Sequence, residues 1–311
     1  MEKEKKGSLL LKLSYVIYFI ILFVISAFYL FPYEKVKDYV EYKASEAILC
    51  DVSIEEMDYG PLSGLRFTGI NVKKDIKGDL IDIIDIDELL LTSYYSSLFK
   101  DTISVKMASN IYDGQLNGTL SIPKSAGNKI AKIDMDVKNL DISKYHALSV
   151  LSKSKLMGIL SGSASLLGSL GDINSIQGDL NISITDGLVA GVVINDLGSG
   201  FIRIEKMELP DITYKSINAS LNKEQRVIKI KKFSISGDDV NAQISGNLNI
   251  GTSLRGTSSN LGVKVSLSES YLSKDKTLSL FDSNFNSMKD KDGYYNIKVE
   301  GSLLKPRIKA L

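Results

Sequence analysis

Reactive side chains are scarce in this sequence of 311 residues. It contains one cysteine, Cys50, one histidine, His146, and no tryptophan. A lone cysteine cannot form an intramolecular disulfide, and a zinc site of cysteine and histidine needs more ligands than these two. Ser-His-Asp or Cys-His catalysis would depend on His146 alone, which we expect to be a surface or packing residue. Because Walker, G-x-G-x-x-G and G-x-S-x-G patterns are also absent, we predict a protein that is not an enzyme and holds no cofactor.

A strong net charge is missing as well. Lys and Arg total 38 against 37 Asp and Glu, which leaves a net charge of +1. A nearly neutral chain has no global field that would recruit nucleic acid, so no nucleic-acid partner is expected. The composition, 44% hydrophobic and 24% charged, is ordinary for a chain that folds around a core.

One acidic cluster has the composition of a cation site without its spacing. Asp79, Asp82, Asp85, Asp87 and Glu88 offer the oxygen ligands that Ca²⁺ prefers. They lie among leucines and isoleucines, however, and lack the Asp/Asn-Gly loop of calcium sites. We interpret the cluster as the solvated side of a β-strand, and no metal site is predicted.

The first long hydrophobic run predicts a membrane anchor. Residues 13–31 carry no charge over 19 positions and follow a lysine-bearing start. At about 1.5 Å per residue, such a helix spans a hydrocarbon core of about 30 Å. A cleaved signal peptide is the alternative, but its apolar region would be about 7–15 residues long and would end in an A-x-A-like site. We therefore predict a cytoplasmic segment at 1–12, a transmembrane helix at 13–31, and export of the rest.

A short amphipathic helix is expected in residues 32–50. Apolar residues recur at helical spacing between Glu34 and Leu49, and charged residues occupy the other side. Such a helix either caps the following sheet or binds lipid by itself, and we favour the first interpretation.

The remaining residues, 51–311, are dominated by a pattern of period two. Leu180, Ile182 and Ile184, for example, alternate with polar residues. Strands of this kind have one apolar and one solvated face, which antiparallel sheets allow and parallel sheets do not. The expected fold class is mainly β, with a long, curved, mostly antiparallel sheet and a few short helices. Helical patterns are confined to 93–99, 143–151 and, ambiguously, 271–281, whereas the glycine-rich segments 161–171, 191–200 and 251–262 are expected to be turns.

A one-sided sheet must cover its apolar face with a second sheet, helices, a partner or lipid. The sequence leaves two architectures open: a sandwich that closes on itself, or a trough with an apolar interior. Three segments, 118–122, 178–182 and 246–250, share the pattern Gly-polar-Leu-polar-Ile. The glycine either permits a bulge or sheet curvature, which we favour, or widens a groove for an acyl chain. The candidate groove-lining residues are Leu120, Ile122, Leu180, Ile182, Leu248 and Ile250.

Four segments resemble the type II secretion system protein N family, which is related to the AsmA-like proteins of the Gram-negative envelope. In the order of that family they are Phe31–Lys37, Met57–Ile70 with its Pro-then-Gly-Leu turn, Ile235–Leu248 and Val299–Pro306. The resemblance extends from the predicted anchor to the C-terminus.

This resemblance implies a single-pass protein of the bacterial inner membrane with a β-rich periplasmic domain, and it brings no catalytic residues. The first functional hypothesis is a non-enzymatic accessory protein that contacts type II secretion components. The alternative is an AsmA-like lipid-binding or lipid-transfer protein that holds phospholipid in an apolar β-groove. A purely structural scaffold is a third possibility.

Overall fold

The structure is a computed structural model of the chain. It describes residues 15, 18, 19, 22, 23, 26, 30, 32–60, 64–76, 78–93, 99–125, 130–145, 147, 150, 154–169, 173–197, 204–251, 256–286, 289–302 and 305–310. The chain forms two compact units, Met1–Ile48 and Leu49–Leu311.

The first unit contains one well-described helix, α2 (Tyr33–Ile48), at the place where the sequence predicts an amphipathic helix. Its half-buried residues recur at helical spacing and include Val36, Val40 and Ala44. Among the described residues, no helix combines the length and apolar character needed to cross a bilayer. Most of residues 13–31 lie outside the described part of the chain, so the anchor stays a prediction.

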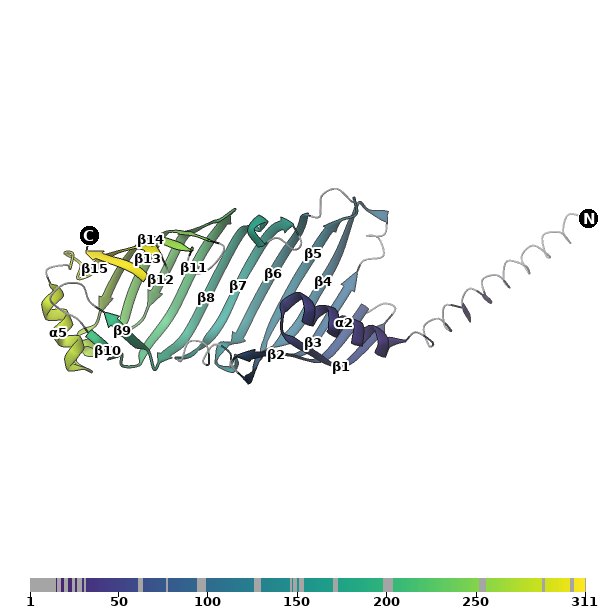
Figure 1. Ribbon diagram of the computed structural model, residues 1–311, viewed down its shortest axis with the longest axis horizontal. Coiled ribbons are helices and arrows are strands. Elements are labelled where there is room, and N and C mark those ends of the chain that lie inside the picture. Colours follow the sequence, from purple (N-terminus) through teal and green to yellow (C-terminus); the bar gives the residue numbers. More distant parts are fainter. Residues whose placement is uncertain are drawn as a thin grey trace, which may run out of the picture. The chain divides into compact units, whose positions relative to one another are not determined.

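The second unit is built on one open antiparallel sheet of fourteen strands, drawn in Figure 1. Strands that follow one another in the chain pair antiparallel, except that β8 pairs with β11 around the separate two-stranded sheet of β9 and β10. The strands of the large sheet are β1 (Asp51–Gly60), β2 (Gly64–Ile76), β3 (Asp79–Ser93), β4 (Thr102–Ile111), β5 (Gly114–Pro123), β6 (Ile130–Asp141), β7 (Lys155–Ser169), β8 (Gln177–Ala190), β11 (Ile212–Glu224), β12 (Val227–Ser236), β13 (Val240–Asn249), β14 (Ser258–Leu267), β15 (Tyr295–Ser302) and β16 (Lys305–Ala310); the small sheet has β9 (Val193–Leu197) and β10 (Ile204–Glu208).

The prediction of a mainly β, antiparallel fold is confirmed. The sandwich is not the architecture, because all the long strands belong to one open sheet rather than to two facing sheets. Alternation explains this arrangement, since each strand contributes one apolar row and one polar row to the same two faces.

Short helices accompany the sheet. They are α4 (Glu269–Leu272) and α5 (Lys276–Phe285), with 3₁₀ turns η2 (Ile142–Lys144) and η3 (Ile173–Ser175). The ambiguous segment 271–281 is thus largely helical. The turns expected at 161–171 and 191–200 are largely wrong, because residues 161–169 continue β7 and residues 193–197 form β9. Residues 258–262 of the third expected turn likewise belong to β14. Most of the short helix predicted at 93–99 lies outside the described residues, as does His146.

Fully buried apolar side chains are concentrated toward the two ends of the sheet. Ile54, Met57, Phe67, Ile70 and Val72 are buried on β1 and β2. At the other end, Val240 packs with three helix residues from α4 and α5. The strands between these ends contribute few buried residues, and this difference positions the candidate site.

Candidate functional site: the apolar face of the sheet

The strand register assembles one continuous apolar face across the middle of the sheet. Leu120 on β5 lies between Val105 on β4 and Ile133 on β6. Ile133 in turn pairs with Leu166 on β7. The row continues on β8 and β11, where Leu180 pairs with Leu221. Apolar residues from strands far apart in sequence therefore form a single surface, which we call the apolar face.

The structure brings five of the six predicted groove residues onto this face. Leu120 and Ile122 lie on β5, Leu180 and Ile182 on β8, and Leu248 on β13, and all five are half-buried. Ile250 follows the end of β13, where its backbone N–H donates to the carbonyl of Arg226 at 2.6 Å. The last candidate thus lies at the rim of the sheet.

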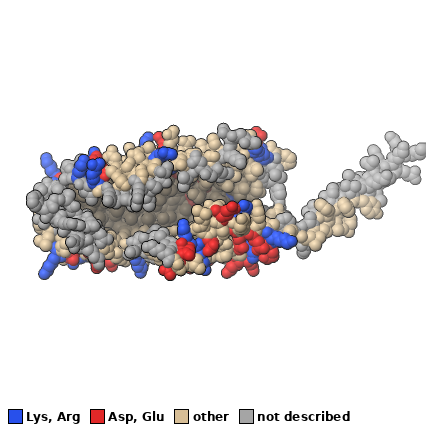
Figure 2. Space-filling model, in the orientation of Figure 1, with Lys and Arg blue, Asp and Glu red and all other residues tan. Residues whose placement is uncertain are grey.

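Among the residues that the structure describes, no second layer buries the middle of the apolar face. Its leucines and isoleucines on β5 to β8 and on β11 to β13 are half-buried, whereas the fully buried residues in these rows include the small Ala131, Ala164 and Ala242. Ile103 on β4 is 40% exposed. Figure 2 shows this unit hollowed between two rims, with a largely tan floor and charged side chains gathered along the rims. The middle of the face is open to solvent.

Several residues of the apolar face were not among the predicted groove residues. On β4, Ile103, Val105 and Met107 face the same side as Leu120. Their alternation with Ser104 and Lys106 is a period-two pattern from which they could have been predicted. On β7, the apolar row is diluted by Gly162 and by the serines between its members, and this composition resembles that of a turn.

The recurring glycines permit close approach of neighbouring strands. Gly178 has a φ of +145°, and a Cβ there would lie 2.0 Å from the carbonyl oxygen of Ser165 on β7. Gly246 has a φ of +128°, and its Cβ would lie 2.2 Å from the carbonyl oxygen of Asn260 on β14. A side chain would strain the backbone at both positions. This geometry favours the interpretation that these glycines serve backbone conformation.

One end of the apolar face is covered. Tyr271, Leu272 and Leu278 from α4 and α5 pack on Val240, with Val265 and Leu267 beside it. Val240 continues the apolar row of β13, so the helices close this end of the face.

A buried carboxylate fastens the covering helices to the sheet. Asp239 is 6% exposed and accepts hydrogen bonds from Thr213 Oγ1 at 2.6 Å and from the Thr213 N–H at 2.9 Å. Lys274, directly after α4, donates to its other oxygen at 2.9 Å. Burial acts to raise the pKa of Asp239, but these hydrogen bonds outweigh it and hold the pKa below the usual range. Burial raises the pKa of the neighbouring Tyr271 to about 12, and its hydroxyl donates to the Pro210 carbonyl.

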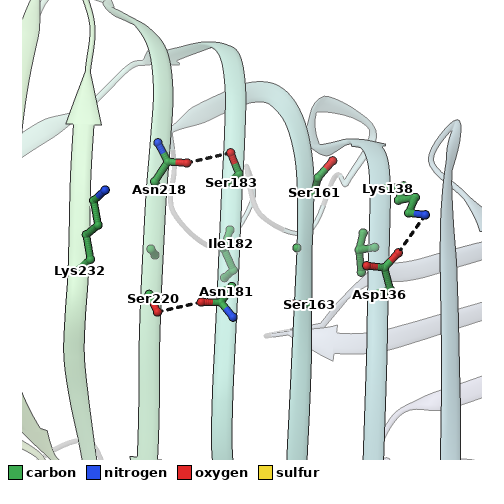
Figure 3. Close-up of a pocket in the computed structure, with 13 residues that line it drawn as sticks. Asp136, Lys138, Ser161, Ser163, Asn181, Ile182, Ser183, Asn218, Ser220 and Lys232 are labelled. Atoms are coloured by element: carbon green, nitrogen blue, oxygen red, sulfur yellow. Dashed lines mark hydrogen bonds and ion pairs between the residues drawn. The ribbon is translucent and has the colours of Figure 1, made fainter.

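The opposite face of the sheet is polar. In its middle, drawn in Figure 3, Ser183 donates to Asn218 at 3.0 Å and Ser220 donates to Asn181 at 2.8 Å. These residues line a shallow depression of about 470 Å³ that extends from Asp136 to Lys232. Because many of its hydroxyl and amide groups bond to one another across strands, we interpret this face as the solvated side of the sheet.

The predicted acidic cluster lies on β3, as the strand interpretation requires. Asp79, Asp82, Asp85 and Asp87 are exposed, and Glu88 is half-buried beside Arg66 at 3.0 Å. Among the residues that the structure describes, no three His, Cys, Asp or Glu side chains are grouped to hold a metal ion.

The chain was compared with protein-family models, curated proteins and solved structures, and none of them matches it.

Proposed function

We propose that this protein binds the acyl chains of membrane lipids on the apolar face of its sheet. The observation that carries the proposal is the row of half-buried leucines and isoleucines that no described part of the chain covers with a second layer. Monomeric soluble proteins rarely leave a contiguous apolar patch larger than a few hundred Å² exposed, and larger patches mark binding surfaces.

The side chains of the face suit an acyl chain better than a protein partner. The register places Leu, Ile, Val and Met along its middle, with Phe233 as an aromatic exception on β12. Protein interfaces are enriched in Tyr, Trp and Arg, which provide directional anchors. An acyl chain needs only apolar contact, and each buried methylene contributes about 0.8 kcal/mol.

The dimensions of the sheet also fit lipids. Fourteen strands, at about 4.8 Å between neighbours, extend over about 60 Å. Each leaflet of a bilayer contributes about 15 Å of hydrocarbon thickness. The face is therefore long enough to hold several acyl chains in a row, as lipid transfer requires.

The predicted anchor at 13–31 would keep such a face next to its ligand. We propose a single-pass protein of the bacterial inner membrane, with the sheet in the periplasm and phospholipid as the bound molecule. The resemblance of four segments to AsmA-related proteins supports this location.

The direct test is mass spectrometry of lipids that co-purify with the full chain. We expect phospholipid with the wild-type protein and at least a fivefold reduction in Ile182→Asp. An acyl chain bound on the face would remove water from the new carboxylate, which is energetically costly. Asn181→Asp is the matched control: it adds the same charge to the neighbouring residue, on the polar face, and lipid should be retained. A lipid-free wild-type protein would refute the proposal.

A role as an accessory of type II secretion is the second proposal. It is supported by the resemblance of the four segments to the type II secretion system protein N family. Deletion of the gene should then reduce the secreted exoproteins, and unchanged secretion of every substrate would contradict this role.

A further inference from the structure

We infer that the apolar face binds lipids whose headgroup carries a net negative charge, and that one rim of the sheet holds this headgroup. The inference rests on the proposed function and specifies its ligand. It comes from the distribution of charge at the two ends of the strands, which the hairpin topology separates into two opposite rims.

The first rim is basic. It contains the connections of β3 to β4, β5 to β6 and β11 to β12, and these carry Lys100, Lys124 and Arg226, all exposed. Asp101 lies among them, and Glu224 beside Arg226 is already paired with Lys229 at 3.2 Å. The described cations of this rim therefore outnumber its carboxylates.

The second rim is rich in carboxylates. Asp113, Asp141, Asp211 and Asp238 lie there, at the connections of β4 to β5, β6 to β7, β8 to β11 and β12 to β13. Two of its lysines form ion pairs with these carboxylates: Lys144 pairs with Asp113 at 2.5 Å, and Lys215 pairs with Asp238 at 2.6 Å. A phosphate at this rim would meet like charge.

A single cation marks where the basic rim meets the apolar face. Lys223 on β11 lies on the apolar side of the sheet, because it alternates with polar-face residues and follows Leu221 by two positions. It is the one charged side chain that alternation places on this side among the described residues of β5 to β7 and of the paired segments 178–184 and 217–223. It pairs with Gly178 in the register, and its amine donates to the Ile176 carbonyl between β7 and β8. Arg226 follows three residues later in the adjoining turn.

These positions determine how a lipid can lie. Its acyl chains favour the apolar floor, and its polar headgroup must remain at a rim because burial without partners is costly. A phosphate favours the basic rim, where an ammonium offers three donors and a guanidinium can bind two oxygens at once. A zwitterionic headgroup also carries a positive group, which the basic rim repels, so its binding is stabilised less than that of an anionic headgroup.

The experiment uses the full chain in detergent, equilibrated with an equimolar mixture of phosphatidylglycerol and phosphatidylethanolamine with identical acyl chains. Native mass spectrometry then measures the ratio of the two lipids bound. We expect an excess of phosphatidylglycerol that declines as salt is raised, because salt screens exposed charges. Arg226→Glu and Lys124→Glu should each lower the ratio at least about fivefold, since one basic residue near an anionic surface contributes about that factor.

Three further variants separate the effect of charge from an effect on folding. Lys223→Met keeps an aliphatic side chain where the basic rim meets the apolar face, and it should also lower the ratio of the two bound lipids. Arg226→Lys keeps the positive charge that Arg226→Glu reverses, so its ratio should be close to that of the wild-type protein. Lys155→Glu reverses an exposed lysine at the start of β7, on the carboxylate-rich rim, and should leave the ratio unchanged.

The outcomes distinguish the two claims. If neither lipid binds, the proposed function itself is wrong. If both bind in equal amounts, or if Lys155→Glu changes the ratio as much as Arg226→Glu, acyl-chain binding stands and the assignment of the headgroup is overturned. Glycerol 3-phosphate, which has the phosphate but no acyl chain, should not compete at millimolar concentration. Competition by it would show a free-phosphate site and would also overturn the inference.

Discussion

The covered and the open parts of the apolar face share one strand pattern but differ in what lies on them. At the start of β13, Val240 is 8% exposed because α4 and α5 cover it. At the other end of the same strand, beyond these helices, Leu248 is only half-buried. Alternation thus produces an apolar face everywhere, but a core forms only where another element supplies side chains to pack on it.

Substitution of the covering helix should give the largest effect. Leu278 on α5 is 3% exposed, and Leu278→Asp removes its packing and buries a charge. We expect a loss of about 4 kcal/mol in the free energy of unfolding, measured with urea. Leu280→Asp, on the same helix but 64% exposed, should change it by less than about 0.5 kcal/mol. Equal effects would mean that α5 does not cover the sheet.

The buried carboxylate of Asp239 gives the next test of the covered end. Asp239→Ala leaves Lys274 and the Thr213 N–H without their acceptor, which should cost about 3 kcal/mol. Asp238→Ala removes a neighbouring carboxylate that pairs with Lys215 at the surface, and should cost less than about 1 kcal/mol. Urea unfolding of both variants checks the difference.

Acid should loosen the covered end by the same interaction. Because folding lowers the pKa of Asp239, its contribution is complete above the unfolded value of about 3.9 and is lost as pH falls through the lower folded value. We expect the protection of the amides in α4 and α5, which is their exchange rate relative to the intrinsic rate at the same pH, to decrease on acidification below about pH 4. Asp239→Asn should show less of this pH dependence; an unchanged profile would assign it to other carboxylates.

The strand geometry itself should be sensitive at the glycines of the open region. Gly246→Ala places a Cβ against the Asn260 carbonyl at positive φ, which should cost about 2–3 kcal/mol. Gly293 also has positive φ, at +80°, but no atom lies within 4 Å of its Cβ position. Gly293→Ala should therefore cost about 1 kcal/mol, through backbone strain alone. Thermal unfolding of the two variants measures the steric contribution.

The sequence supports prediction of the strands better than prediction of what covers them. Period two is a local signal, so segments such as 178–184 reveal both their conformation and their apolar side. The second half of β7 was not predicted as a strand, because residues 161–168 combine strand alternation with the small residues typical of turns. The pairing of β8 with β11 depends on contacts between distant segments, which no local pattern specifies. The same applies to the packing of α4 on Val240, and hence to which end of the face is closed.

The smallest change in stability is expected on the open face, where the loss of function should be greatest. Leu248→Asp should cost about 1 kcal/mol, because a half-buried side chain loses little packing and its new charge remains hydrated. Co-purifying lipid should nevertheless fall at least fivefold, whereas Asn247→Asp, on the polar face of the same strand, should retain it. A cost as large as that of Leu278→Asp would mean that this part of the face is a closed core like the part under α4 and α5. A small cost together with lost lipid would establish that the two regions share a strand pattern but use it for different purposes, one for stability and the other for binding.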